Sequence, residues 1–158
     1  ALLTVATWLS AGERPNFSGE WVLNKERCTL PATVMVSLSA GSITIDHRDP
    51  MFKCRRTFTV WGKAVNNEYD LLSNGVEDER DEPNGKAFLR LVWDGDVLVQ
   101  TTRVVTSNGE ALDTLRYRLQ EGGTVLEVAE DYRSPLTNAV NVWIFEKPAP
   151  PAATTPAP

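Results

Sequence analysis

The chain of 158 residues is long enough for one domain with a hydrophobic core of its own. Hydrophobic residues make up 42% of it and charged residues 23%, a balance typical of globular proteins that excludes wholesale disorder. The formal net charge of −5 at pH 7 argues against a surface for nucleic acid or anionic membranes, because both need a basic footprint.

The first twelve residues differ from the rest of the chain in composition. Residues 1–9 form an apolar run, and Ser10 and Gly12 place small residues where a signal peptidase requires them. The run is too short to span a bilayer. We therefore expect residues 1–12 to be a signal-peptide remnant and the protein to be secreted or periplasmic. The alternative is an N-terminal helix that docks on the end of the domain.

Short runs rich in β-branched and aromatic residues follow at intervals of roughly 10–15 residues, a spacing typical of all-β proteins. Asn-Gly, Asp-Gly and Gly-Gly pairs separate many of them, and these residues tolerate the positive φ angles of tight hairpins. No stretch shows sustained helical periodicity. The predicted strands are residues 19–23, 42–47, 53–61, 67–72, 76–80, 86–93, 97–105, 112–120, 124–133 and 139–146.

Alternation along the later runs favours a barrel. In the run 97–105, Val97 and Val99 lie on one face and Leu98 and Val104 on the other, so neither face is wholly polar. Such strands suit a barrel that has a core at one end and a partly polar cavity at the other. Hairpins in succession make a meander, and long meanders avoid exposed edges by closing. A β-sandwich is the alternative.

We therefore predict an all-β fold in which residues 13–147 form a single up-and-down antiparallel barrel of about ten strands. The remaining residues, 148–158, consist only of Pro, Ala and Thr. No core can be built from these residue types, so we expect a disordered or polyproline-like tail.

One segment resembles a known family. Residues 16–27 read NFSGEWVLNKER, which resembles the first strand of the calycin superfamily (lipocalins and fatty-acid-binding proteins), where Gly-x-Trp opens the strand. The greatest similarity is to secreted bacterial lipocalin-like proteins. Gly19 lets the backbone bend into the barrel floor, and Trp21 plugs that end. The resemblance implies a barrel that binds small apolar or amphipathic molecules.

The last predicted strand departs from the family pattern. It has no Arg to stack on the Trp as in lipocalins, and Trp143-Ile144-Phe145 stands where fatty-acid-binding proteins have an Arg-x-Tyr carboxylate clamp. We therefore expect no carboxylate clamp at the family position. The chain also lacks a pattern for the helix pair that covers those proteins.

Arginine and aromatic residues within or at the ends of strands are the candidate ligand contacts. An arginine that faces a barrel interior needs an internal acid or a ligand anion as its partner. Neighbours on a strand face opposite sides, so only one of Arg116 and Tyr117 can point inward. The alternatives are arginines that pair across strands in solvent and tryptophans that cap the core. The candidates are Trp61, Trp93, Arg103, Arg116, Tyr117 and Trp143.

The two cysteines, Cys28 and Cys54, form no Cys-x-x-Cys motif. In an exported protein we expect them to form a disulfide, which would add about 3–4 kcal/mol to stability. In a cytosolic protein they would be free thiols.

No pattern of catalytic or metal-binding residues stands out. The single histidine, His47, ends a strand before a Pro turn, where a structural role is expected, and the acidic run 77–82 is typical of a solvated hairpin. We expect no metal, no cofactor and no catalytic residues. The leading hypothesis is non-covalent binding of a small hydrophobic or amphipathic molecule inside the barrel. The alternatives are an envelope interaction module with a filled barrel, or a lipocalin-like isomerase or cyclase.

Overall fold

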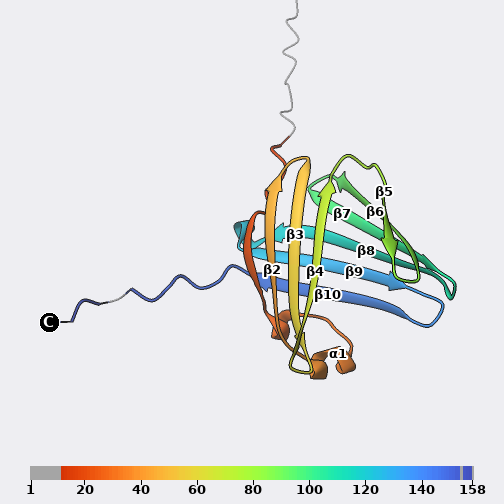
Figure 1. Ribbon diagram of the computed structural model, residues 1–158. Coiled ribbons are helices and arrows are strands. Elements are labelled where there is room, and N and C mark those ends of the chain that lie inside the picture. The colour runs from red at the N-terminus through yellow and green to blue at the C-terminus, as the bar shows by residue number, and fades with distance from the viewer. Residues whose placement is uncertain (1–11, 154, 158) are drawn as a thin grey trace, which may run out of the picture.

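A computed structural model describes residues 12–153 and 155–157 and confirms the predicted all-β meander (Figure 1). Ten antiparallel strands form one sheet in the order β4-β3-β2-β1-β10-β9-β8-β7-β6-β5, so β1 and β10 bring the two ends of the domain together. The strands are β1 (Gly19–Leu23), β2 (Leu38–Arg48), β3 (Met51–Val60), β4 (Lys63–Leu72), β5 (Asp78–Glu82), β6 (Gly85–Asp94), β7 (Val97–Thr106), β8 (Gly109–Gln120), β9 (Val125–Arg133) and β10 (Asn138–Glu146).

The sheet wraps into a nearly closed barrel, with β2–β4 crossing in front of β7–β10 in Figure 1. It ends at β4 and β5, and no ladder joins these two strands in the described chain. Arg80 of β5 instead donates a hydrogen bond to the carbonyl oxygen of Asp70 in β4, at 3.0 Å. We call this gap the seam. Its cause lies in β5, whose five residues are all charged, because short charged edges resist pairing.

Aromatic residues close the end of the barrel that lies next to the start of β1. Phe17 is fully buried and stacks on Trp93, with 5.9 Å between ring centroids. The backbone N–H of Phe17 donates to Nδ1 of the buried His47, at 3.2 Å. The indole N–H of Trp21 donates to the carbonyl oxygen of Phe17, at 3.0 Å. Trp21 is 1% exposed and plugs this end, as the motif predicts.

Lysine supplies the cation that the family pattern places over the tryptophan. Lys147, directly after β10, lies with Nζ 4.0 Å from the centroid of the Trp21 ring. Its Nζ also donates to the carbonyl oxygen of Ser18, at 3.1 Å. A cation over an indole face is favourable, so the first and last strands are joined without the missing arginine.

The other end of the barrel carries a short helix, α1 (Ala32–Ser37), which the sequence did not predict (Figure 1). It connects β1 to β2, after a single 3₁₀ turn at Lys25–Arg27. The backbone N–H of Trp61, in the β3–β4 turn, donates to the carbonyl oxygen of Ser37 at 2.9 Å. This contact holds the turn against the helix, and together they cover the open end.

The predicted disulfide is wrong, because Cys28 and Cys54 are both free thiols. Cys54 points from β3 into the core and is 2% exposed. Cys28 lies beside β10, where its sulfur accepts the N–H of Ile144 at 3.2 Å and donates to the carbonyl oxygen of Asn24 at 3.2 Å. The two thiols therefore have separate structural roles, and burial raises the pKa of both.

Beyond β10, residues 148–153 and 155–157 are exposed and contain no helix or strand. They lead away from the barrel in Figure 1. No helix in the described part of the chain has the length and apolar character needed to cross a membrane.

Candidate functional site

A cavity of about 280 Å³ lies inside the barrel, between α1 and the aromatic end. Its apolar wall includes Leu38, Phe58, Leu115, Val128, Trp143 and Phe145. Its polar groups include Arg56, Asn67, Tyr69, Asp113 and Glu130. A mainly apolar hollow with a few polar groups is the usual form of a small-molecule site.

Arg56 carries the only positive charge among the described residues that line this cavity. Strand alternation places it there, since Phe52 and Cys54 precede it on the inward face of β3. Its Nη2 donates to the hydroxyl of Tyr117, at 2.7 Å. That hydroxyl donates to Oε1 of the fully buried Gln100, at 3.1 Å. The network joins β3, β8 and β7 across the interior.

The hydrogen-bonding capacity of this network is not used up. Nε of Arg56 and Nε2 of Gln100 are buried and have no hydrogen-bond partner. No salt bridge joins Arg56 to a carboxylate of the described residues, and its guanidinium lies 4.9 Å from the centroid of the Tyr69 ring. Arginine stays charged in proteins, and a buried charge without a counter-ion is costly. Arg56 therefore offers a charged donor without a hydrogen-bond partner to an anion that enters the cavity.

Two carboxyl groups lie on the same wall of the cavity. Oε2 of Glu130 accepts hydrogen bonds from Nε1 of Trp143 and Nδ2 of Asn141, both at 2.7 Å. Asp113 has a buried oxygen, Oδ1, with no partner. Burial, together with the charge of Glu130, raises the pKa of Asp113 to about 6, although Arg56 opposes the shift. Asp113 thus titrates close to neutral pH.

Three of the six candidate residues face the interior. Tyr117 is fully buried and donates within the Arg56 network, so it is the inward member of the Arg116–Tyr117 pair. Trp143 lines the cavity. Trp93 belongs to the aromatic end, where its Nε1 donates to Asp49 at 2.8 Å, and it does not line the cavity.

The other three candidates lie outside. Trp61 is 72% exposed in the β3–β4 turn. Arg103 packs over Phe88 and forms ion pairs with Glu77 and Glu110. Arg116 forms an ion pair with Asp94, at 3.5 Å. These arginines follow the alternative in which strand arginines pair with acids in solvent, so neither is placed to hold a ligand in the cavity.

The sequence analysis missed Arg56, Asp113 and Glu130. A signal for Arg56 is present in β3, where Phe52, Cys54 and Phe58 alternate with polar residues and put Arg56 in line with the apolar face. Asp113 lies on the same face as Leu115 and Tyr117 of β8 by the same rule. No local signal distinguishes Glu130 from a solvated strand residue.

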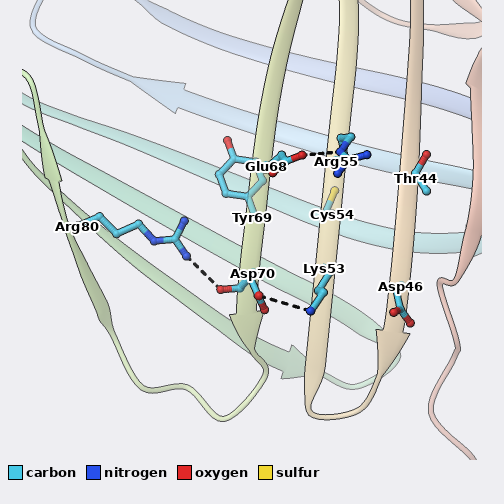
Figure 2. Close-up of a pocket in the computed structure, with 9 residues that line it drawn as sticks. All are labelled: Thr44, Asp46, Lys53, Cys54, Arg55, Glu68, Tyr69, Asp70 and Arg80. Carbon is cyan, nitrogen blue, oxygen red and sulfur yellow. Dashed lines mark hydrogen bonds and ion pairs between the residues drawn. The ribbon is translucent and has the colours of Figure 1, made fainter.

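A second hollow, of about 580 Å³, lies over the outer side of β2–β4 (Figure 2). Its charged groups all have ion-pair partners. Lys53 pairs with Asp70 at 3.7 Å and Arg55 pairs with Glu68, as Figure 2 shows. Asp46 pairs with Arg48, and Arg80 pairs with Asp78 while it also donates to the carbonyl oxygen of Asp70. With its charges already satisfied, this groove lacks the unpaired donors of the inner cavity.

Within residues 12–153, the single histidine of the chain lies apart from the cavity's polar network. No group of three or more His, Cys, Asp or Glu side chains in that range is arranged to hold a metal ion. His47 is 2% exposed at the aromatic end and does not line the cavity. Burial lowers its pKa, although the nearby Asp49 opposes the shift.

No family model and no curated protein matches the chain. Solved structures do match it. Human cRBP IV has a TM-score of 0.59 at 14% identity, covering 85% of this chain and 99% of that one. A secretory abundant heat soluble protein from Ramazzottius varieornatus has a TM-score of 0.56 at 13% identity, covering 83% and 94%. Zebrafish ileal bile acid-binding protein, in complex with cholic acid, has a TM-score of 0.54 at 14% identity, covering 88% and 100%.

The chain has a calycin-like fold. Within this calycin-like barrel, the polar network lies away from the last strand. Arg56 belongs to β3 and Tyr117 to β8, while Trp143 and Phe145 of β10 face the cavity as apolar groups. The charged groups of this cavity therefore do not lie at the last-strand position of the carboxylate clamp.

Proposed function

We propose that the protein binds a small amphipathic molecule whose anionic group lies against Arg56 and whose apolar part fills the cavity. One observation carries this proposal: a guanidinium with a buried, unpartnered Nε, and without a described carboxylate partner, faces a largely apolar cavity. A ligand anion would pair directly with the guanidinium of Arg56 and accept the hydrogen bond that its Nε lacks.

The empty volume favours a binder over the alternative of a structural module with a filled barrel. A cavity of about 280 Å³ is close to the lower end of the range for small-molecule sites, about 300 Å³. The zebrafish protein of similar fold was crystallised with cholic acid, which is itself an organic acid. Medium-chain acids are therefore suitable probes.

Calorimetric titration with dodecanoate and dodecanol tests the role of Arg56. We expect dodecanoate to bind more tightly than dodecanol, and Arg56→Met to lose about 10- to 100-fold of the dodecanoate affinity, as for a lost charged hydrogen bond. Arg55→Met is the matched control. Arg55 directly precedes Arg56 on β3, and its side chain points outward and pairs with Glu68. Loss of the Arg55 charge should therefore leave dodecanoate binding unchanged.

Two results would contradict the proposal. One is equal affinity of the wild-type protein for dodecanoate and dodecanol. The other is an equal loss of binding in Arg56→Met and Arg55→Met, since only a general electrostatic or stability effect would act through both arginines.

Asp113 favours a second candidate function, a lipocalin-like isomerase or cyclase. Burial and the charge of Glu130 raise its pKa to about 6, and a carboxyl group of this kind can exchange a proton at neutral pH. The two functions differ in the fate of the ligand. A ligand recovered unchanged indicates binding, whereas a product that forms only when Asp113 is present indicates catalysis.

We also propose that the domain is related to secreted bacterial lipocalin-like proteins and acts outside the cytoplasm. Support comes from the motif around Phe17, Gly19 and Trp21 and from the signal-like composition of residues 1–12. The free thiols of Cys28 and Cys54 remove the argument from a disulfide. Mass spectrometry of the protein from its own host should find an N-terminus at Glu13, and a mature chain that retains residues 1–12 would contradict cleavage.

A further inference from the structure

The barrel interior contains unpaired hydrogen-bonding atoms of both kinds. Nε of Arg56, which lines the cavity, and Nε2 of Gln100, which does not, are buried donors without partners. Oδ1 of Asp113 is a buried acceptor without a partner, on a different strand of the same interior. An anionic head at Arg56 would satisfy donors only, so it would leave the acceptor unmet.

Glu130 does not supply the hydrogen bond that Asp113 lacks. Its Oε2 instead accepts hydrogen bonds from Trp143 and Asn141. Asp113 and Glu130 therefore form an acidic stretch of wall on which Oδ1 of Asp113 still lacks a donor.

The strands place this acidic wall beside the ligand volume. Leu115 of β8 is opposite Glu130 of β9 in the sheet register, and Asp113 is two residues from Leu115 on the same inward face. Asp113, Leu115 and Glu130 all line the cavity together with Arg56. A single ligand in this volume can touch both the guanidinium and the acidic wall.

We propose that Asp113 is a second recognition point, which selects anionic amphipathic molecules that carry a hydroxyl group on their apolar part. This inference rests on the proposed function, because it assumes that Arg56 holds the anionic head. A hydroxyl donates the one hydrogen bond that Oδ1 of Asp113 needs without adding a charge. An ammonium group would instead lose far more hydration than a hydroxyl on entering a largely apolar cavity.

Competition titrations with dodecanoate and a series of hydroxydodecanoates, with the hydroxyl at successive positions from carbon 3 to carbon 12, test the inference. We expect at least one hydroxylated acid to bind about tenfold more tightly than dodecanoate, because a site with an unmet acceptor discriminates against a ligand that lacks the donor. An amino acid of the same chain length, 12-aminododecanoate, should bind no more tightly than dodecanoate.

Variants of Asp113 test whether this residue causes the preference for hydroxylated acids. Asp113→Asn keeps an oxygen acceptor and should keep the preference. Asp113→Leu and Asp113→Ala remove the acceptor and should lose it, while dodecanoate binding shows that each barrel is folded. Asp94→Asn is the matched control, since Asp94 ends β6 on the outside of the barrel and pairs with Arg116.

The outcomes separate the two proposals. If dodecanoate binds through Arg56 but no hydroxylated acid binds more tightly, or if the preference survives in Asp113→Leu or Asp113→Ala, the inference about Asp113 is overturned. Tighter binding of 12-aminododecanoate would overturn the choice of a hydroxyl. If dodecanoate does not bind through Arg56 at all, the proposed function itself fails.

Discussion

Arg55 and Arg56 are neighbours in the chain with opposite roles. Arg55 points outward and pairs with Glu68, whereas Arg56 points inward and hydrogen-bonds to Tyr117. Neighbouring residues of a strand face opposite sides of the sheet, and this alternation alone gives the two arginines different surroundings. The function that we propose therefore depends on the register of β3, because a shift of one residue would exchange the two arginines.

The pKa of Asp113 predicts a pH dependence of anion binding. Its folded-state pKa is raised to about 6, so lowering the pH through 6 removes a negative charge that repels an anionic head at Arg56. Burial is the main cause of the raised pKa; the charges of Glu130 and Asp131 add to it, and Arg56 opposes it. We expect the affinity for dodecanesulfonate, whose own charge is constant, to rise roughly threefold to tenfold from pH 8 to pH 5. The slope should vanish in Asp113→Asn, and a slope that persists there would assign the effect elsewhere.

His47 predicts a pH dependence of stability with the opposite sign. Its Nδ1 accepts the N–H of Phe17, and burial lowers its pKa below that of an unfolded chain, about 6.5. Below about pH 6.5 the unfolded state binds more protons than the folded state. The contribution of His47 to stability is therefore complete above about pH 6.5 and is lost as the pH falls below that value. The free energy of unfolding of the wild type should therefore fall relative to His47→Leu between pH 7.5 and pH 5. A constant difference in urea denaturation would contradict this role.

The direction of a side chain was predictable only where a strand pattern was followed through. Tyr117 and Trp143 were found because their strands alternate clearly, and both face the interior. Arg103 and Arg116 fall on the outer face, where acids on neighbouring strands pair with them. The isolated charges of Asp113 and Glu130 depend on contacts between distant strands, which a local pattern does not contain.

At the scale of elements, all ten predicted strands are present, with ends that shift by a few residues. The run 42–47 extends to Leu38–Arg48, because the preceding residues continue the pairing with β3 past an irregularity between Leu38 and Ala40. The helix α1 was missed since six residues are too few to show a helical period. That omission matters, because α1 covers the cavity.

Two valines of α1 provide a prediction about this cover. Val34 lines the cavity, whereas Val36 is 72% exposed. Val34→Asp should weaken dodecanoate binding about tenfold, because it puts a negative charge and a desolvation cost beside the ligand. Val36→Asp should change the affinity less than twofold. Equal effects of the two substitutions in calorimetry would show that α1 acts through its overall charge or stability.

At the scale of the molecule, the barrel follows from the meander, but its incomplete closure does not. The turn pairs and the alternation predict neighbouring hairpins, and the Gly19–Trp21 motif predicts the plugged end. The seam arises because β5 is short and charged, so β4 keeps an unpaired edge that Arg80 reaches by its side chain. The resulting calycin-like barrel has one plugged end, one end under α1 and a cavity between them. Residues 1–11 lie outside the described chain, so the signal-peptide remnant stays a prediction.

A crystal structure of the protein with dodecanoate tests the account most directly. We predict that the carboxylate lies about 2.7–2.9 Å from the guanidinium nitrogens of Arg56, as in charge-assisted hydrogen bonds, with the chain along Phe58 and Trp143. A carboxylate that points toward α1 and solvent, or a ligand found only in the outer groove over β2–β4, would contradict it.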